Sequence, residues 1–241
     1  MISDKNINNF YSSLIGTGLA EIITLPICTL KTNFQNSNQQ SIKTLTKSLY
    51  QQHGIKIFYN ASFPAIMGQM ISTSSKYTLY KFLTTNEKNP IKNKFLNGMI
   101  GGVTSSLITH PLDVVKVHLQ MKYNFSNVLR EEGIKLFYRG YSKTFTKIAI
   151  SSSCFFPIYE TINEKIDNPM MASTFSGFLS AIIMHPADYL KTRHMSGKPL
   201  YQGLNPLIYY KGLSLNLLRI VPHFMITMTT IEYLKKIDFF N

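Results

Sequence analysis

The chain has 241 residues, and 15% of them are charged, which is below the roughly 25% of ordinary soluble domains. The charges are unbalanced, because 25 Lys and Arg residues stand against 12 Asp and Glu residues and give a formal net charge of +13. A sparse but strongly positive charge favours an anionic partner, such as a lipid head group, a nucleic acid or a phosphate-bearing solute. Two cysteines, Cys28 and Cys154, are too few for a disulfide framework or a zinc site.

The first residues, MISDKNINNFYSS, do not contain the apolar core of a secretory signal or the arginines of a transit peptide. Six later stretches are long and apolar enough to predict membrane helices, each near the roughly 20 residues that a bilayer requires. In chain order they cover residues 10–34, 62–84, 95–120, 142–164, 170–194 and 213–236. Each also carries polar or charged residues, which suits an all-α membrane protein whose helices enclose a water-filled cavity.

Two short signatures recur three times in the same order, which indicates an internal repeat. The first, Pro-x-acid-x-x-base, is found in HPLDVVKVHLQ (110–120) and HPADYLKTRHM (185–195), and in LPICTLKTNFQ (25–35) with Cys28 in place of the acid. The second is found in HGIKIFYNA (53–61), EGIKLFYRG (132–140) and QGLNPLIYYKG (202–212). We expect three repeats over residues 1–88, 89–167 and 168–241, within one structural domain.

This pair of signatures resembles the repeat of the mitochondrial carrier family, P-x-[DE]-x-x-[KR]-x-[KR] followed by [DE]-G-x-x-x-x-[YF]-[KR]-G, over nearly the whole chain. The resemblance implies six transmembrane helices in a pseudo-threefold bundle around a central cavity, with a short matrix-side surface helix in each repeat. It also implies alternating access across the mitochondrial inner membrane, a monomer, no cofactor, and contact with membrane lipid such as cardiolipin. The compact length and AT-rich composition are similar to those of a family member encoded by a giant virus.

Proline inside an apolar helix removes a backbone hydrogen bond and kinks it. Pro26, Pro111 and Pro186 are therefore expected to bend the first, third and fifth helices so that their ends converge. Small residues nine and thirteen positions before each proline should let neighbouring helices approach closely. These positions are Ser13, Thr17, Gly98, Gly102, Ser173 and Gly177.

Transferred to these positions, the matrix gate of the family predicts two ion pairs between helices, Asp113 with Lys191 and Asp188 with Lys31. The third pair is expected to be missing, because a cysteine occupies position 28 and Lys116 has no matching acid. The residues that match the glutamine braces of the family are Gln35 and Gln120.

A second gate is expected on the cytosolic side, where the family pattern [YF]-[DE]-x-x-[KR] aligns with YKFLT (80–84), YETIN (159–163) and IEYLK (231–235). Glu160 with Lys235 keeps a complementary pair, whereas Lys81 replaces an acid. The charged residues of this gate are Lys81, Glu160, Glu232 and Lys235. Because gate strengths set the conformational bias, we expect easier opening to the cytosolic side.

The family contacts its solute from the even-numbered helices, seven and eight residues after the closing glycine position of the second signature. Lys147 and Arg219, at aligned depth, are interpreted as an anion clamp in which Arg219 grips phosphate in bidentate fashion. The other mapped positions are Gly68, Gln69, Ile148 and Ile220, and further polar contacts are expected from Ser72, Ser151 and Asn216. Glu21 is expected to face the same water, either paired with Lys147 or Arg219 or bound to an amino or base group of the solute.

These residues favour exchange of nucleotides, ATP and ADP or deoxynucleotides such as dATP, since the cations suit phosphates and Gln69 and Ile148 suit a flat base. Lys147 stands where nucleotide carriers usually have glycine, so di- or tricarboxylates and keto acids stay open as solutes, as does a non-transporting membrane adaptor with the carrier fold. A nucleic-acid-binding protein is disfavoured, because the basic residues recur at helix ends instead of clustering on one face. Neither a catalytic motif nor a metal-ligand spacing indicates an enzyme.

Overall fold

The structure is a computed structural model that describes residues 4–38, 41–85, 94–166 and 169–236, and within these ranges the regular structure is entirely helical. The six long helices are α1 (Asp4–Asn36), α3 (Ser62–Thr85), α4 (Lys94–Gln120), α6 (Tyr141–Ile166), α7 (Pro169–Met195) and α8 (Leu213–Lys236). The short helices are α2 (Ile42–His53), α5 (Phe125–Glu132) and the 3-10 helices η1 (Ile55–Tyr59), η2 (Gly133–Tyr138) and η3 (Pro206–Tyr210). The six long helices overlap the six stretches that the sequence predicts.

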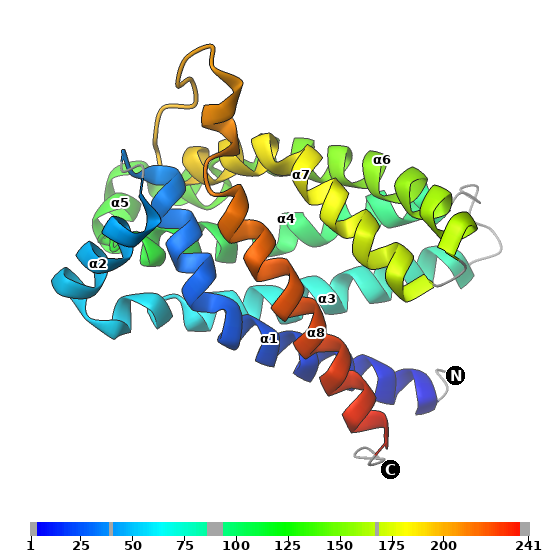
Figure 1. Ribbon diagram of the computed structural model, residues 1–241. Helices are drawn as coiled ribbons and strands as arrows, with labels where there is room; N and C mark the ends of the chain where they lie inside the picture. Colours follow the sequence, from blue (N-terminus) through cyan, green and yellow to red (C-terminus); the bar gives the residue numbers. More distant parts are fainter. Residues whose placement is uncertain (1–3, 39–40, 86–93, 167–168, 237–241) are drawn as a thin grey trace.

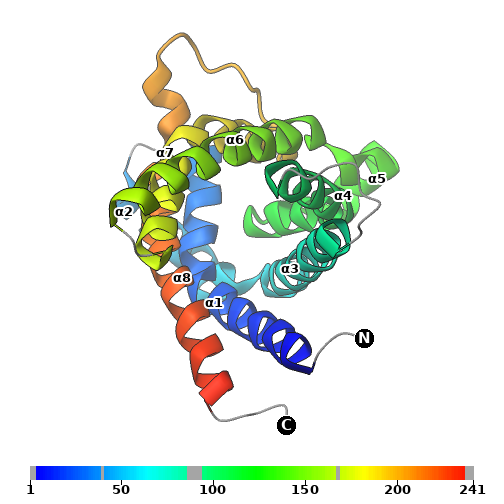
Figure 2. The same cartoon turned by 90° about the vertical axis from the view of Figure 1, so that its right-hand side faces the viewer.

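The long helices form a closed ring in chain order (Figures 1 and 2). Each packs against the next, and α8 returns to pack against α1. The first, third and fifth long helices, α1, α4 and α7, also contact one another. The basic residues of their first signatures, Lys31, Lys116 and Lys191, line one cavity. This arrangement positions the functional site.

Hydropathy supports fewer membrane spans than the sequence analysis expects. Within the described ranges, Leu14–Asn36 of α1 is the segment that combines the length and mean hydropathy, 1.4, of a candidate membrane span. Polar residues dilute the other long helices: α4 carries buried Ser105 and Thr109, and α7 carries buried Ser176 and Ser180.

The third repeat differs from the first two, because it contains no α-helix between its long helices. Helix α2 buries Leu45 and Leu49 against α1 and α8, and α5 packs Val128 and Leu129 against α4 and η2. In contrast, residues 196–205, SGKPLYQGLN, form no helix, and their two glycines and proline explain why. The expectation of three surface helices is therefore wrong for the third repeat, whose connection extends away from the ring in orange in Figure 1.

In the second and third repeats, the histidine that precedes the proline connects the first signature to the second. His110 Nε2 lies 3.1 Å from the carbonyl oxygen of Arg139, and His185 Nε2 lies 3.3 Å from that of Lys211. Both histidines are fully buried. They fix the segment that leads into α6 or α8 against the proline-containing helix of the same repeat.

The closing glycine of the second signature is required by its backbone. Gly140 and Gly212 adopt φ values of +82° and +87°, a region that residues with a Cβ atom rarely enter. A Cβ on Gly140 would also lie 3.3 Å from the His194 Cβ atom. The turn into α6 therefore tolerates little besides glycine.

Lys211, the base of the second signature in the third repeat, lies outside the long helices. Its Nζ atom donates to the carbonyl oxygen of Ser37 at 2.5 Å and lies 4.7 Å from the Phe34 ring centroid. Partial burial lowers the pKa of Lys211, and the nearby Arg193 cation acts in the same direction. This lysine links the third repeat to the end of α1.

The three predicted prolines lie inside α1, α4 and α7, which continue through them. The predicted close approach holds at Gly102, where a Cβ atom would lie 3.4 Å from Ile148, but not at Gly177, where nothing lies within 4 Å. Thr17 is buried, and the side-chain positions of Ser13, Gly98 and Ser173 are outside the described part of the chain.

Candidate solute-binding cavity

A cavity of about 580 Å³ lies between the six long helices, and every one of them contributes to its wall. The predicted solute contacts on its surface are Gly68, Gln69, Lys147, Ile148, Ser151, Asn216, Arg219 and Ile220. The predicted gate residues on the same surface are Lys31, Asp113, Lys116, Asp188, Lys191 and Gln120. Glu21 and Gln35, which the sequence also assigns to the site, are not among the residues that line the cavity. The following contacts show how the charges of the cavity are paired.

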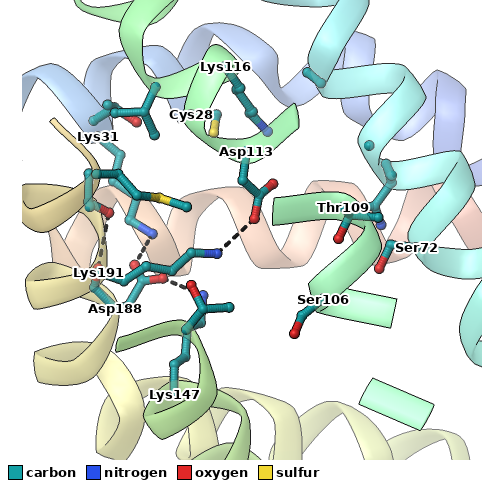
Figure 3. A pocket seen from close by; sticks show the side chains of 18 of the residues that line it. Cys28, Lys31, Ser72, Ser106, Thr109, Asp113, Lys116, Lys147, Asp188 and Lys191 are labelled. Carbon is teal, nitrogen blue, oxygen red and sulfur yellow. Dashed lines mark hydrogen bonds and ion pairs between the residues drawn. The ribbon is translucent and has the colours of Figure 1, made fainter. Parts of the chain in front are cut away.

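Asp188 binds two cations from different helices (Figure 3). Its Oδ2 atom accepts from Lys31 of α1, as the sequence predicts, and its Oδ1 atom accepts from Lys147 of α6. Lys31 also donates to Asn216 Oδ1 at 2.9 Å. Lys147 and Asn216, which the sequence analysis assigns to the solute, therefore also contact residues of the predicted matrix gate.

Asp113 and Lys191 form the second predicted pair, with Lys191 Nζ 2.8 Å from Asp113 Oδ2 (Figure 3). This pair joins α4 to α7. The Asp113 side chain is 36% exposed, against 7% for Asp188. It is the more hydrated of the two carboxylates and holds one cation instead of two.

Lys116 has a partner, which the sequence analysis does not predict. Its Nζ atom lies 2.5 Å from Glu21 Oε1, and Arg219 Nη2 lies 2.5 Å from Glu21 Oε2. Glu21 precedes Cys28 by seven residues, or two helical turns, and therefore faces the same side of α1. The prediction of an unpaired Lys116 is wrong, because the acid that it needs sits two turns earlier instead of at position 28.

The two predicted glutamine braces differ. Gln120 Oε1 accepts from Thr32 Oγ1 at 2.8 Å, and Gln120 Nε2 donates to Thr29 Oγ1 at 3.3 Å, so this side chain joins α4 to α1. Gln35 is also fully buried, but in the described part of the structure neither atom of its amide has a hydrogen-bond partner.

The second predicted gate falls on positions whose side chains the structure does not describe. Lys81, Glu160, Glu232 and Lys235 all lie outside the described side chains. Their pairing stays a prediction.

The charges around the cavity do not cancel. Five cations, Lys31, Lys116, Lys147, Lys191 and Arg219, are paired with three carboxylates, Glu21, Asp113 and Asp188. Among the described residues this leaves an excess of two positive charges in a partly desolvated space. Such an excess attracts an anion, and attraction is stronger there than in bulk water.

The sequence is similar to that of known membrane carriers over most of its length. The sequence pattern described as "Mitochondrial carrier protein" matches residues 3–86 and again residues 87–169. The chain belongs to the mitochondrial carrier family. Members of this family are transporters of small solutes and not enzymes, and the repeated signatures identified above are those of the family.

Relatives span most of the carrier chain. A mitochondrial carrier-like protein of Acanthamoeba polyphaga mimivirus is 56% identical over 93% of this chain and 94% of its own length. A mitochondrial substrate carrier family protein of Dictyostelium discoideum is 26% identical over 91% of this chain and 92% of its own. The succinate/fumarate mitochondrial transporter of Saccharomyces cerevisiae is 25% identical over 79% of this chain and 76% of its own.

Proposed function

We propose that this carrier exchanges nucleotides, ATP and ADP or deoxynucleotides such as dATP, across the mitochondrial inner membrane by alternating access. The observation that carries the proposal is the placement of Lys147 and Arg219, from α6 and α8, on the wall of one cavity with an excess of positive charge. A polyphosphate offers enough negative charge to replace the carboxylates that both cations now hold.

The remaining wall suits the rest of a nucleotide. Gly68 and Gly102 carry no side chain into the cavity, and Gln69 and Ile148 offer an amide and an apolar surface beside them. An adenine ring can use both, by hydrogen bonding to the amide and packing against the aliphatic group. Ser151 lies on the same wall as a further hydrogen-bonding group.

Dicarboxylates are the second candidate. The excess of two positive charges equals the charge of one dicarboxylate, and one relative is named as a succinate/fumarate transporter. Such a solute is smaller and would leave the surface around Gln69 and Ile148 unused.

We also propose two gates that close the cavity on opposite sides of the membrane. We assign the matrix gate to Lys31, Asp113, Lys116, Asp188 and Lys191, with Gln35 and Gln120 beside it, and the cytosolic gate to Lys81, Glu160, Glu232 and Lys235. A monomer and bound cardiolipin stay predictions.

Uptake into liposomes tests the function. The purified carrier is reconstituted with or without internal counter-substrate and supplied with labelled ATP, ADP, dATP, phosphate, malate, succinate or oxoglutarate. Nucleotide uptake that requires internal nucleotide supports the proposal. Uptake of dicarboxylates alone supports the second candidate, and uptake of no solute favours the membrane adaptor.

A further inference from the structure

We propose that Glu21 is the third acid of the matrix gate and that it competes directly with the solute for Arg219. The inference rests on the proposed transport of an anion, and it names a residue that links solute binding to the gate. It departs from the sequence pattern of the first signature, in which position 28 would supply this acid.

Glu21 takes the place of the acid that the family pattern has at position 28. Lys116 is the gate lysine of the second repeat, and its Nζ atom lies 2.5 Å from Glu21 Oε1. Glu21 and Cys28 are separated by seven positions, which amount to about 10.5 Å along the axis of α1. The contact that closes the gate is therefore displaced along α1, away from the end that carries the other first-signature residues and toward the depth of Arg219.

The Glu21 carboxylate is shared between Lys116 and Arg219. Glu21 is 1% exposed, and its two oxygens bind cations of α4 and α8. A third group, His223 Nδ1 of α8, lies 4.0 Å from Oε2. One buried side chain on α1 thus connects three helices, and any group that removes Arg219 from it changes the cross-link.

The Arg219 guanidinium is only partly hydrogen-bonded within the described part of the structure. Its Nε and Nη2 atoms form the edge that grips an oxyanion through two parallel hydrogen bonds. Glu21 occupies Nη2, whereas Nε is buried and has no hydrogen-bond partner among the described residues. A buried donor without an acceptor is unfavourable, so an oxyanion that takes both positions satisfies Nε and displaces Glu21.

Two consequences follow, and they can be separated. Competition from Glu21 raises the concentration of anion needed to occupy Arg219. The contact with Lys116 restrains the empty carrier from changing conformation, which favours exchange over net uniport. Solute binding breaks the contact with Arg219 first, and the gate then depends on one cation instead of two.

The experiment compares Glu21→Gln with Glu21→Gln/Cys28→Asp in liposomes, using the anion that the unaltered carrier transports. Glu21→Gln removes the competing charge, so its KM should fall about tenfold, as expected for loss of a charged hydrogen bond. The ratio of uniport to exchange should rise. Adding Cys28→Asp returns an acid to Lys116 at the family position, so the ratio should return toward that of the unaltered carrier while KM stays low.

A surface variant serves as the control. Glu131→Gln removes a carboxylate from an exposed position on α5, and it should change neither quantity. Folding of each variant is measured by thermal unfolding in detergent.

The outcomes separate this inference from the proposed function. If the unaltered carrier takes up no anion, the proposed function is wrong and this inference fails with it. If it does take up an anion, an unchanged KM and uniport ratio in Glu21→Gln overturn the inference alone. If Glu21→Gln does not fold, failure of Cys28→Asp to restore a folded, coupled carrier overturns it as well.

Discussion

The carboxylates of the cavity fall into two groups. Glu21 and Asp188 are 1% and 7% exposed and each holds two cations, whereas Asp113 is 36% exposed and holds one. Removing one partner of a buried ion pair costs about 3–5 kcal/mol, and hydration of a half-buried pair such as Asp113 with Lys191 lowers that cost toward the roughly 0–1 kcal/mol of a surface pair. The proposed matrix gate is therefore uneven, with two buried carboxylates that each hold two cations and one more hydrated carboxylate that holds one.

Each buried carboxylate also joins a gate lysine to a predicted solute contact. Asp188 links Lys31 to Lys147, and Glu21 links Lys116 to Arg219. The hydrated Asp113 links two gate residues only, since its partner is Lys191. An anion that binds Lys147 and Arg219 thus acts directly on the buried contacts and leaves the exposed one unaffected.

The largest effect is expected from Arg219→Ala, which removes the proposed anion grip and leaves Glu21 with one cation. Uptake should fall by about 100-fold or more, since loss of a charged partner in a binding site costs roughly 2–5 kcal/mol. Initial uptake rates in liposomes measure the loss of transport. Arg219→Lys is the comparison variant, because lysine keeps the positive charge but cannot bind an oxyanion in bidentate fashion. Normal transport by Arg219→Ala would mean that the solute site is elsewhere.

Asp188→Asn tests the buried side of the comparison. It leaves Lys31 and Lys147 without their carboxylate in a nearly closed environment. We expect the free energy of unfolding to fall by about 3–5 kcal/mol and exchange to be strongly impaired. Thermal unfolding in detergent and exchange assays measure the two effects, and a change no larger than that of Asp113→Asn would contradict the division into two groups.

Asp113→Asn tests the exposed side with the same chemical change. Water reaches the half-buried Asp113 side chain, so the free energy of unfolding should fall by less than in Asp188→Asn, toward the roughly 0–1 kcal/mol of a surface pair. Exchange should be retained, with a modest rise in uniport. Loss of stability equal to that of Asp188→Asn would show that exposure does not separate the pairs.

The smallest effect is expected from Gln35→Leu. Replacing a buried amide that has no hydrogen-bond partner by an apolar group is neutral or slightly stabilising. The matched variant Gln120→Leu breaks contacts to Thr29 and Thr32 and should destabilise by about 1–3 kcal/mol. Equal unfolding midpoints for the two variants would show that the buried contacts of Gln120 add nothing.

Sequence signatures located most of the site because they act through local chain geometry. The repeated prolines mark three equivalent helices, and the gate of the resembled family, transferred to the positions after them, implies the pairs Asp113 with Lys191 and Asp188 with Lys31. Counting from the closing glycines likewise gives Lys147 and Arg219, both of which lie on the cavity wall.

Other contacts escaped the sequence because they depend on depth in the bundle. The family pattern compares identical positions in each repeat, so it registered an acid missing at position 28 and left Lys116 without a partner, although Glu21 was already expected to face the cavity. The contact of Glu21 with Lys116 depends on the depth at which α1 and α4 meet, which the pattern does not give. The loss of the third surface helix was also visible in principle, in the glycines and proline of residues 196–205.

The sequence by itself determined a triplicated helical chain of the mitochondrial carrier family with cations directed to one centre, because repeats, prolines and glycines impose their geometry locally. Only the tertiary structure decided which cation each carboxylate holds. That choice depends on how far along their axes α1, α4, α6, α7 and α8 meet, and on how much water reaches each meeting point.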